Sequence, residues 1–371
     1  MRRAGLALLA ALAPIGLACA GLACVAAPAR AQDSAVCPPD AELDYVCGPE
    51  KPEDVLAIPG TDWLVASGFM PGAGLKLVDG KARSFRRWYS AAPAQLAWDR
   101  ARFPQCPGPL DPALFNARGL SLRQVAPQRW QLLAVNHGGR EAIEAFDVHT
   151  DKGEPRLIWR GCQPLPAGQV GNAVAAFADG TILTTVLTRP GTTIGDFMLG
   201  KITGGVWQWR PGDGAFTLLP GTELPGNNGL EIDPDEQRFY VVAFGLHAVA
   251  VYDRRDTRQP QTVIAAPDFM PDNIHWTGGH LLLAGMRLDE PACGGLRKVV
   301  DGKADPMLCH RGWVVGELDL ANHRVATFAY GHPQLGFNGV SAAALSGGAL
   351  WLGSFQSARM AIVRDYQETP R

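Results

Sequence analysis

A polar turn followed by short apolar strands recurs along this chain, and that repetition limits the fold more than any other feature. In the clearest copy, residues 226–253, Leu230 and Ile232 alternate with polar neighbours before an Asp-Pro-Asp-Glu turn. Such alternation is typical of a half-buried strand. The apolar runs 239–244 and 248–252 predict two more strands. A meander of about three strands is too small to bury its own faces.

Five further copies follow the same order, and they begin near residues 53, 118, 172, 271 and 338. The units are spaced irregularly, at very roughly 45 to 70 residues. In a β-propeller, units that repeat in this way bury the faces of their sheets against one another. We therefore predict an all-β fold, a six-bladed β-propeller. The alternative, a β-sandwich with long loops, shows no sixfold pattern.

Three stretches fall outside the repeat. Residues 32–50 are polar and contain prolines, so we interpret them as a lead-in to the first blade. The stretch from Lys81 to Leu114 has no clean period and predicts outer strands followed by an elaborated loop over one face. The stretch from Leu288 to Arg311 is predicted to be an insertion in blade five.

The N-terminus has the features of an export signal. Arg2 and Arg3 precede an apolar stretch, 6–24, and an Ala-Arg-Ala cleavage pattern ends at residue 31. We expect a signal peptide over 1–31, a single propeller domain over 32–371, and a periplasmic or secreted protein without a stable membrane span. The alternatives are an uncleaved anchor and a lipid anchor at Cys19 or Cys24, where glycine replaces the leucine that such sites favour.

Six of the eight cysteines remain after the predicted cleavage. An even number in an exported chain favours disulfides, and the absence of a C-x-x-C pair makes a metal site less favoured. We expect sequence neighbours to pair, which gives Cys37 with Cys47, Cys293 with Cys309 and, by remainder, Cys106 with Cys162.

Charge and motifs exclude several functions. A formal net charge of −2 argues against a nucleic-acid partner. The chain lacks the zinc-protease, serine-hydrolase and phosphate-loop patterns, and it has no dinucleotide-binding glycine motif after a strand.

Polar side chains recur at the entry to the first strand of several predicted blades. They are Glu53, Asn172, Asn228, Asp272 and Asn273. Because the innermost strands of a propeller line its central channel, we expect these positions to converge near the axis. Carboxylate and amide oxygens facing one point would suit Ca²⁺, which takes about six to eight oxygen ligands. The alternative is that each residue caps a turn.

Four stretches carry a family resemblance: PEDVLAIPG at 52–60, LLAVNHGGREAIEAFDV at 132–148, NNGLEIDPDEQRFYV at 227–241 and MPDNI at 270–274. On these, the chain resembles the paraoxonase/arylesterase branch of the six-bladed propellers that include gluconolactonases and strictosidine synthase-like proteins. The resemblance covers most of the mature chain and is weak between Gly80 and Phe115.

The resemblance implies a calcium-dependent hydrolase of small lactones or esters. It implies that the five polar residues hold a catalytic calcium, and that Asp54 and the Leu120 carbonyl hold a second, structural calcium. One departure concerns that second site: the family has an aspartate directly after the blade-three asparagine, where this chain has Ala173.

A second departure concerns the base. The family carries a histidine pair that is thought to activate water; His137 matches the outer member, but Arg118 stands at the inner position. Arginine stays protonated, so it cannot be a general base, but it could hold an oxyanion or a substrate carboxylate. His275 is a candidate substitute base or a structural histidine, and a carboxylate such as Glu53 or Asp272 is a further candidate. His137 has its own structural alternative, a histidine bonded to backbone.

These residues predict an exported propeller with calcium at its axis that hydrolyses a lactone or ester. A sugar lactonase of the gluconolactonase type, which needs no histidine pair, is the second enzyme option. The non-enzymatic alternative is a calcium-stabilised propeller that acts as a binding module. A pyrroloquinoline-quinone dehydrogenase is less favoured, because such propellers have more blades.

Overall fold

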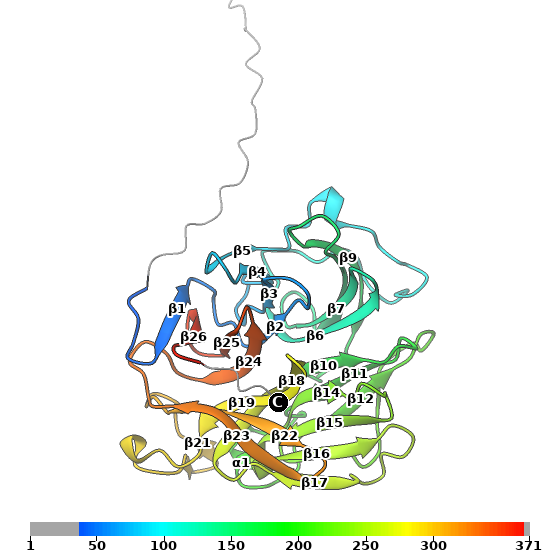
Figure 1. Ribbon diagram of the computed structural model, residues 1–371. Coiled ribbons are helices and arrows are strands. Elements are labelled where there is room, and N and C mark those ends of the chain that lie inside the picture. Colours follow the sequence, from blue (N-terminus) through cyan, green and yellow to red (C-terminus); the bar gives the residue numbers. More distant parts are fainter. Residues whose placement is uncertain (1–36, 367–371) are drawn as a thin grey trace, which may run out of the picture. The chain divides into compact units, whose positions relative to one another are not determined.

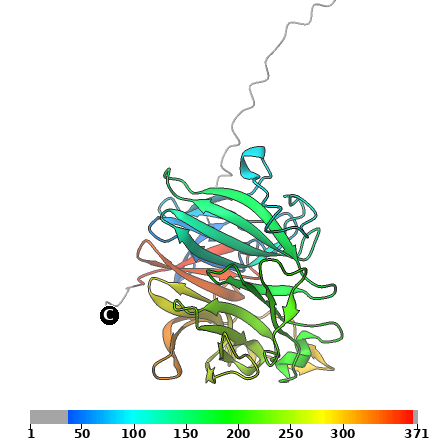
Figure 2. The same cartoon turned by 90° about the vertical axis from the view of Figure 1, so that its right-hand side faces the viewer.

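The computed structural model describes residues 37–366. In that range the chain forms six four-stranded antiparallel sheets arranged as the blades of a β-propeller (Figures 1 and 2), which confirms the predicted fold. The described residues contain a single α-helix, α1 (Ile194–Met198), and none of their helices is long and apolar enough to cross a membrane. The predicted signal peptide, 1–31, lies outside the described residues.

Each blade runs outward from the axis in strand order. Blade one contains β2 (Val55–Ala57), β3 (Trp63–Ala66), β4 (Lys76–Asp79) and β5 (Ser84–Arg87). Blade two contains β6 (Ala117–Ala126), β7 (Arg129–Asn136), β8 (Ala142–His149) and β9 (Arg156–Pro164). Blade three contains β10 (Gly171–Ala176), β11 (Ile182–Val186), β12 (Gly205–Trp209) and β13 (Thr217–Leu218).

The second half of the chain continues the same arrangement. Blade four contains β14 (Asn227–Ile232), β15 (Arg238–Ala243), β16 (Ala248–Asp253) and β17 (Thr262–Ala265). Blade five contains β18 (Phe269–Thr277), β19 (His280–Arg287), β22 (Trp313–Asp319) and β23 (Arg324–Gly331). Blade six contains β24 (Val340–Ser346), β25 (Ala349–Ser354), β26 (Arg359–Val363) and β1 (Leu43–Cys47).

The first strand of the described chain belongs to the last blade. β1 pairs antiparallel with β26, from Leu43 opposite Val363 to Cys47 opposite Arg359, and Figure 1 shows the blue strand beside the red ones. The interpretation of residues 32–50 as a lead-in was therefore wrong for this segment. The pairing gives β26 a partner on its outer side and closes the ring, so that neither end of the sheet array is left open.

The innermost strands form a closed circle. β2, β6, β10, β14, β18 and β24 each contact the next in this order, and β24 contacts β2. Apolar side chains fill the space between neighbouring blades, with Trp159, Trp209 and Trp351 among the largest fully buried ones. The inner strands are thus held rigidly from behind, and side chains that turn toward the axis are fixed in place.

Three disulfides join the predicted pairs, Cys37–Cys47, Cys106–Cys162 and Cys293–Cys309. The second one attaches the stretch after β5 to β9, where Leu96 also forms a bridge with Trp159. That stretch therefore covers the outer edge of blade two. The third one closes the insertion of blade five, which contains the short hairpin of β20 (Val299–Val300) and β21 (Lys303–Ala304).

The blade-two motif forms a buried polar network. Glu144 is fully buried and accepts hydrogen bonds from Arg140 Nε at 2.7 Å, Arg140 Nη2 at 2.8 Å and Trp159 Nε1 at 2.9 Å. We expect Glu144→Gln to lower the free energy of unfolding by about 1–3 kcal/mol, because charge-assisted bonds to Arg140 become bonds to a neutral amide. Urea unfolding would measure this change.

The control for this variant is a surface ion pair on the same sheet. Arg156 lies 3.0 Å from Asp151, and its side chain is 47 % exposed. Arg156→Gln is expected to cost no more than about 1 kcal/mol, because solvent screens exposed pairs. Equal losses in the two variants would show that the Glu144 network contributes no more than a surface contact.

Candidate functional site

Five of the six inner strands carry an irregularity at the same end. The register shifts within β6 (between Ala117 and Leu120), β10 (Gly171 and Val174), β14 (Asn227 and Leu230), β18 (Pro271 and Ile274) and β24 (Val340 and Ala342). A bulge releases a residue from the ladder and turns its side chain. The residues released in this way include Arg118, Asn172, Asn228, Asp272, Asn273 and Ser341. In blade one, Glu53 and Asp54 lie directly before β2.

The bulges bring the predicted cage residues together in a water-excluded position. The amide of Asn172 donates to the side-chain oxygen of Asn228. Asn273 Nδ2 and Ser341 Oγ donate to the backbone oxygen of Glu53, at 3.2 Å and 2.6 Å. Thr185 Oγ1 donates to the backbone oxygen of Asn228 at 2.6 Å. These bonds link blade three to blade four, and they link blades five and six to blade one, near the axis.

Three oxygens at this point are buried without a partner among the described residues. They are Glu53 Oε2, Asn172 Oδ1 and Asp272 Oδ1. A buried polar atom without a hydrogen bond costs about 1–3 kcal/mol, so three of them in one cluster call for a ligand. Carboxylate and amide oxygens are the donors that Ca²⁺ prefers. The residues therefore fit the implied catalytic cation, although Asn228 Oδ1 is already used by Asn172.

The described residues contain no group of three or more His, Cys, Asp or Glu side chains that could hold a metal ion. The cage has only two carboxylates, Glu53 and Asp272, and its remaining donors are amides. Its chemistry is therefore that of a hard oxygen site and not that of a zinc site.

Burial makes both carboxyl groups hold protons tightly. It raises the pKa of Glu53 to about 7, against the opposing charge of Arg118. It also raises the pKa of Asp272 well above its ordinary value, and the nearby Glu53 adds to that rise. A cation bound between them would supply the positive charge that these buried carboxylates lack.

This shift predicts how the metal-free protein responds to pH. Because the pKa of Glu53 is raised above its ordinary value of 4.5 to about 7, its contribution to stability is present below pH 4.5 and is lost as the pH rises through 7. We expect the metal-free protein to lose stability between pH 5 and pH 8 in urea unfolding with EDTA. Glu53→Gln should lose less over the same interval, and an equal loss would contradict the shift.

A pocket of about 470 Å³ opens over this cluster. Arg118, Asn228 and Asp272 contribute polar atoms to its lining. The apolar part of the lining comes from Phe69, Leu187, Ile194, Phe197, Phe244, Met286, Met307 and Phe355. Helix α1 supplies Ile194 and Phe197, and the disulfide-closed insertion supplies Met307. The pocket suits a small molecule with an apolar body and a polar group directed at the axis.

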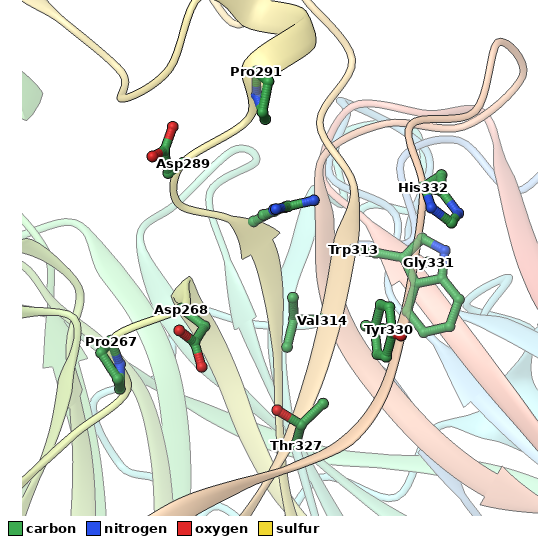
Figure 3. Close-up of a pocket in the computed structure, with 11 residues that line it drawn as sticks. Pro267, Asp268, Asp289, Pro291, Trp313, Val314, Thr327, Tyr330, Gly331 and His332 are labelled. Carbon is green, nitrogen blue, oxygen red and sulfur yellow. The ribbon is translucent and has the colours of Figure 1, made fainter.

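A second pocket of similar volume, about 480 Å³, lies on blade five (Figure 3). Trp313, Tyr330 and Asp268 are among the residues around it, and none of the cage residues lines it. The three unpaired oxygens of Glu53, Asn172 and Asp272 lie beneath the axial pocket, so chemistry and not volume selects it as the candidate site.

His137 lies near the axial pocket without lining it. Its Nδ1 is 2.9 Å from Glu141, and its ring packs edge-on against Phe69, with 5.7 Å between ring centroids. Its Nε2 is buried and has no partner among the described residues. Arg118 contacts the same Phe69 ring and donates through Nε to Glu53 at 3.1 Å. The structure thus brings both predicted residues, His137 and Arg118, into contact with the Phe69 ring.

His275 is held between two carboxylates. Its Nε2 lies 2.8 Å from Asp54 and its Nδ1 lies 3.3 Å from Glu231, so both ring nitrogens face acceptors. Burial lowers the pKa of His275, but the charges of Asp54 and Glu231 outweigh that effect and raise it to about 10. An imidazolium with both nitrogens engaged has no free lone pair, which does not fit the predicted substitute base.

The predicted second calcium does not fit either. The Asp54 carboxylate accepts hydrogen bonds from the backbone N–H groups of Val55 at 2.9 Å and Leu120 at 2.7 Å, and the His275 ring occupies its remaining side. Leu120 thus presents its N–H and not its carbonyl to Asp54. Ala173 also stands in place of the family's aspartate, and the His275 ring contacts Asp54 where the resemblance implied a cation.

Three residues of the site were missed by sequence reasoning. Ser341 occupies the sixth blade's bulge, and an alignment of the six blade entries could have found it. Thr185 and Phe69 lie outside the first strands, on or after the second strand of their blades, and no repeated pattern in the sequence marks them.

The sequence matches no family model. A search of curated proteins finds no match either. Among solved structures, the chain is similar to a luciferin-regenerating enzyme, at 11 % identity and a TM-score of 0.50, over 88 % of this chain and 95 % of the other.

Two further solved structures are similar to the chain. One is a gluconolactonase from Xanthomonas campestris, at 15 % identity and a TM-score of 0.49, over 88 % of this chain and 90 % of the other. The other is regucalcin, a calcium-binding protein from Agrobacterium tumefaciens, at 11 % identity and a TM-score of 0.48, over 90 % and 98 %. These similarities concern the fold, and they do not single out the paraoxonase branch.

Proposed function

We propose that this chain is an exported, calcium-dependent hydrolase of lactones or esters. The observation that carries the proposal is the cluster of three unpaired buried oxygens, from Glu53, Asn172 and Asp272, beneath an apolar pocket of about 470 Å³. A pocket of this size accepts a small organic substrate, and its apolar lining favours an acyl or aryl body over a sugar. The three disulfides support export, because such bonds persist in oxidising compartments.

A calcium ion bound by the cage would polarise the substrate carbonyl and stabilise the negative charge that develops on its oxygen. The chain's own residues have separate tasks. Asp272 lines the pocket and is the nearest candidate to take a proton from the attacking water. Glu53 is oriented by Arg118 through the 3.1 Å hydrogen bond. The phenylalanines and methionines of the lining exclude bulk water from the reacting atoms.

His137 keeps the role of a positioning residue in this proposal. Its contact with Phe69 links the blade-two turn to the pocket lining. His275 is assigned to the scaffold, because Asp54 and Glu231 occupy both of its ring nitrogens.

A non-catalytic calcium-stabilised binding module is the second candidate. It is favoured by one observation: no histidine is among the residues that line the axial pocket, so a neutral-pH base must come from Asp272. An open pocket over the cage favours catalysis over this alternative.

Hydrolysis of a small substrate panel tests the proposal. The panel contains δ- and γ-lactones, an acyl-homoserine lactone and phenyl acetate, each assayed with calcium, with EDTA, and with calcium restored. We expect turnover that disappears with chelation and returns with calcium. Stabilisation by calcium without turnover of any substrate would favour the binding module, and no response to calcium at all would remove the cage.

A further inference from the structure

We propose that the substrate of the axial pocket carries a carboxylate, and that Arg118 binds it. The inference rests on the proposed hydrolase function and adds a substrate class to it. Arg118 lies on the β6 bulge, lines the pocket, and has a side chain that is only 16 % exposed.

Most of the hydrogen-bonding capacity of Arg118 is unused. Its Nε donates to Glu53 Oε1, and its guanidinium carbon lies 4.8 Å from the centroid of Phe69. In residues 37–366 its two terminal nitrogens have no hydrogen-bond partner. The Phe69 contact and the Glu53 bond fix the plane of the guanidinium, so its terminal N–H groups are already oriented when a ligand arrives.

The other cation of the pocket is differently placed. Arg297 donates to the backbone oxygen of Asp305 at 3.3 Å and 3.1 Å, and its Nε lies 3.4 Å from the Asp305 carboxylate. Its charge is therefore already balanced within the insertion. Arg118 is also paired with a carboxylate, Glu53, but through Nε alone, so that within residues 37–366 both of its terminal nitrogens remain for a ligand, whereas Nη2 of Arg297 is engaged.

The chemistry of this position favours a carboxylate. A guanidinium offers two parallel N–H donors at the spacing of the two carboxylate oxygens, and such bidentate pairs are strengthened in a site with little water. The other polar residues of the lining are Thr188, Asn228, Asp272, Arg297 and Gln356, and among them only Arg297 is a cation. We infer a lactone or ester with an apolar body and one carboxylate, which is bound by Arg118 while the ester group lies over the cage.

The test compares two esters that differ only at the terminal group. Monophenyl glutarate carries a carboxylate where phenyl valerate carries a methyl group. We expect the calcium-loaded protein to prefer the glutarate ester in kcat/KM, and Arg118→Gln to reduce that preference about 10- to 100-fold, the effect of a lost charge-assisted pair. Arg297→Gln is the control, and it should leave the preference within about threefold, since Asp305 already occupies Arg297.

Two further measurements separate this inference from the proposed function. Glutaric monoanilide and valeranilide have the same shapes as the esters but resist hydrolysis, so calorimetry of their binding does not need turnover. If the protein hydrolyses neither these esters nor any substrate of the panel, the proposed function fails, and the anilides still decide the inference. Calcium titration of each variant shows whether the cage is intact. If Arg118→Gln no longer binds calcium or does not fold, Arg118→Lys, which keeps the charge, takes its place in the comparison.

Three outcomes would overturn the inference. One is equal binding of the two anilides by the wild-type protein. Another is an equal loss on both esters in Arg118→Gln, which would assign Arg118 to the developing oxyanion. The third is an effect of Arg297→Gln as large as that of Arg118→Gln.

Discussion

Replacing Asp272 with alanine is expected to abolish calcium binding at the axis together with calcium-dependent hydrolysis. Within residues 37–366, Asp272 is the one carboxylate that both lines the pocket and has an unpaired buried oxygen. Its loss removes a negative ligand and the proposed base, so kcat/KM should fall about 10³-fold or more. The thermal stabilisation by calcium, worth about 2.7 kcal/mol at roughly 100 times the Kd, should disappear as well.

Asp268→Ala is the matched control for this prediction. Asp268 lies just before β18 and lines the blade-five pocket of about 480 Å³, where none of the cage residues lies. Removal of this carboxylate should leave calcium binding and hydrolysis close to those of the wild-type protein. Calorimetry and the ester assay would measure both. Unchanged calcium affinity in Asp272→Ala would show that the metal binds elsewhere.

Replacing His275 with alanine is expected to destabilise the fold by about 3–5 kcal/mol, because it leaves a buried carboxylate without its counter-charge. The Asp54 side chain is 1 % exposed, and within residues 37–366 His275 is the only ionisable side chain that pairs with it. Urea unfolding in EDTA would measure the loss. Some of it should return when calcium is added, since the vacated side of Asp54 can then accept a cation.

The double variant Asp54→Ala/His275→Ala tests the cause of that loss. Removal of both partners leaves no buried Asp54 carboxylate without its counter-charge, so the double variant should be more stable than His275→Ala alone. Its stability should not respond to calcium beyond the effect of the axial cage. If the double variant loses the sum of the two single losses, Asp54 and His275 do not act as a pair.

The blade repeat could be predicted because it depends on local chemistry. Each copy combines a polar entry, an apolar strand and a turn, and these signals lie within about 30 residues of one another. The three disulfides also agree with a simple neighbour rule. The role of β1 could not be predicted in this way, because Leu43 finds its partner Val363 at the far end of the sequence.

The candidate site, too, could be predicted from the sequence only where local signals mark its residues. Glu53, Asn172 and Asp272 could be identified from the sequence because equivalent blade positions meet at the axis. Their bulges could not, since a register shift depends on how both strands pack. A structural role for His275 was one of the two alternatives from the sequence, but its partners could not be predicted: Asp54 and Glu231 come from blades one and four, and only the closed ring brings them together.

The family-like motif of blade two also has a clearer explanation in three dimensions. His137 of this motif is a candidate base, yet most of the polar residues of the motif stabilise the blade. Glu144, Arg140 and Trp159 form a buried network behind the inner strand. A motif that resembles one of a catalytic family can therefore reflect residues that stabilise a blade as much as residues that act at the axial site.

The pairing of β1 with β26 also sets the order in which the molecule can be completed. During synthesis Leu43–Cys47 emerges before blades one to five, while Arg359–Val363 emerges after them. Blades one to five can assemble as the chain grows, but the N-terminal strand must wait with its hydrogen-bonding groups unpaired. A chain that is released before blade six has emerged cannot close its ring, even if its other blades have folded. Completion of the propeller therefore depends on β1 remaining available until β26 has emerged.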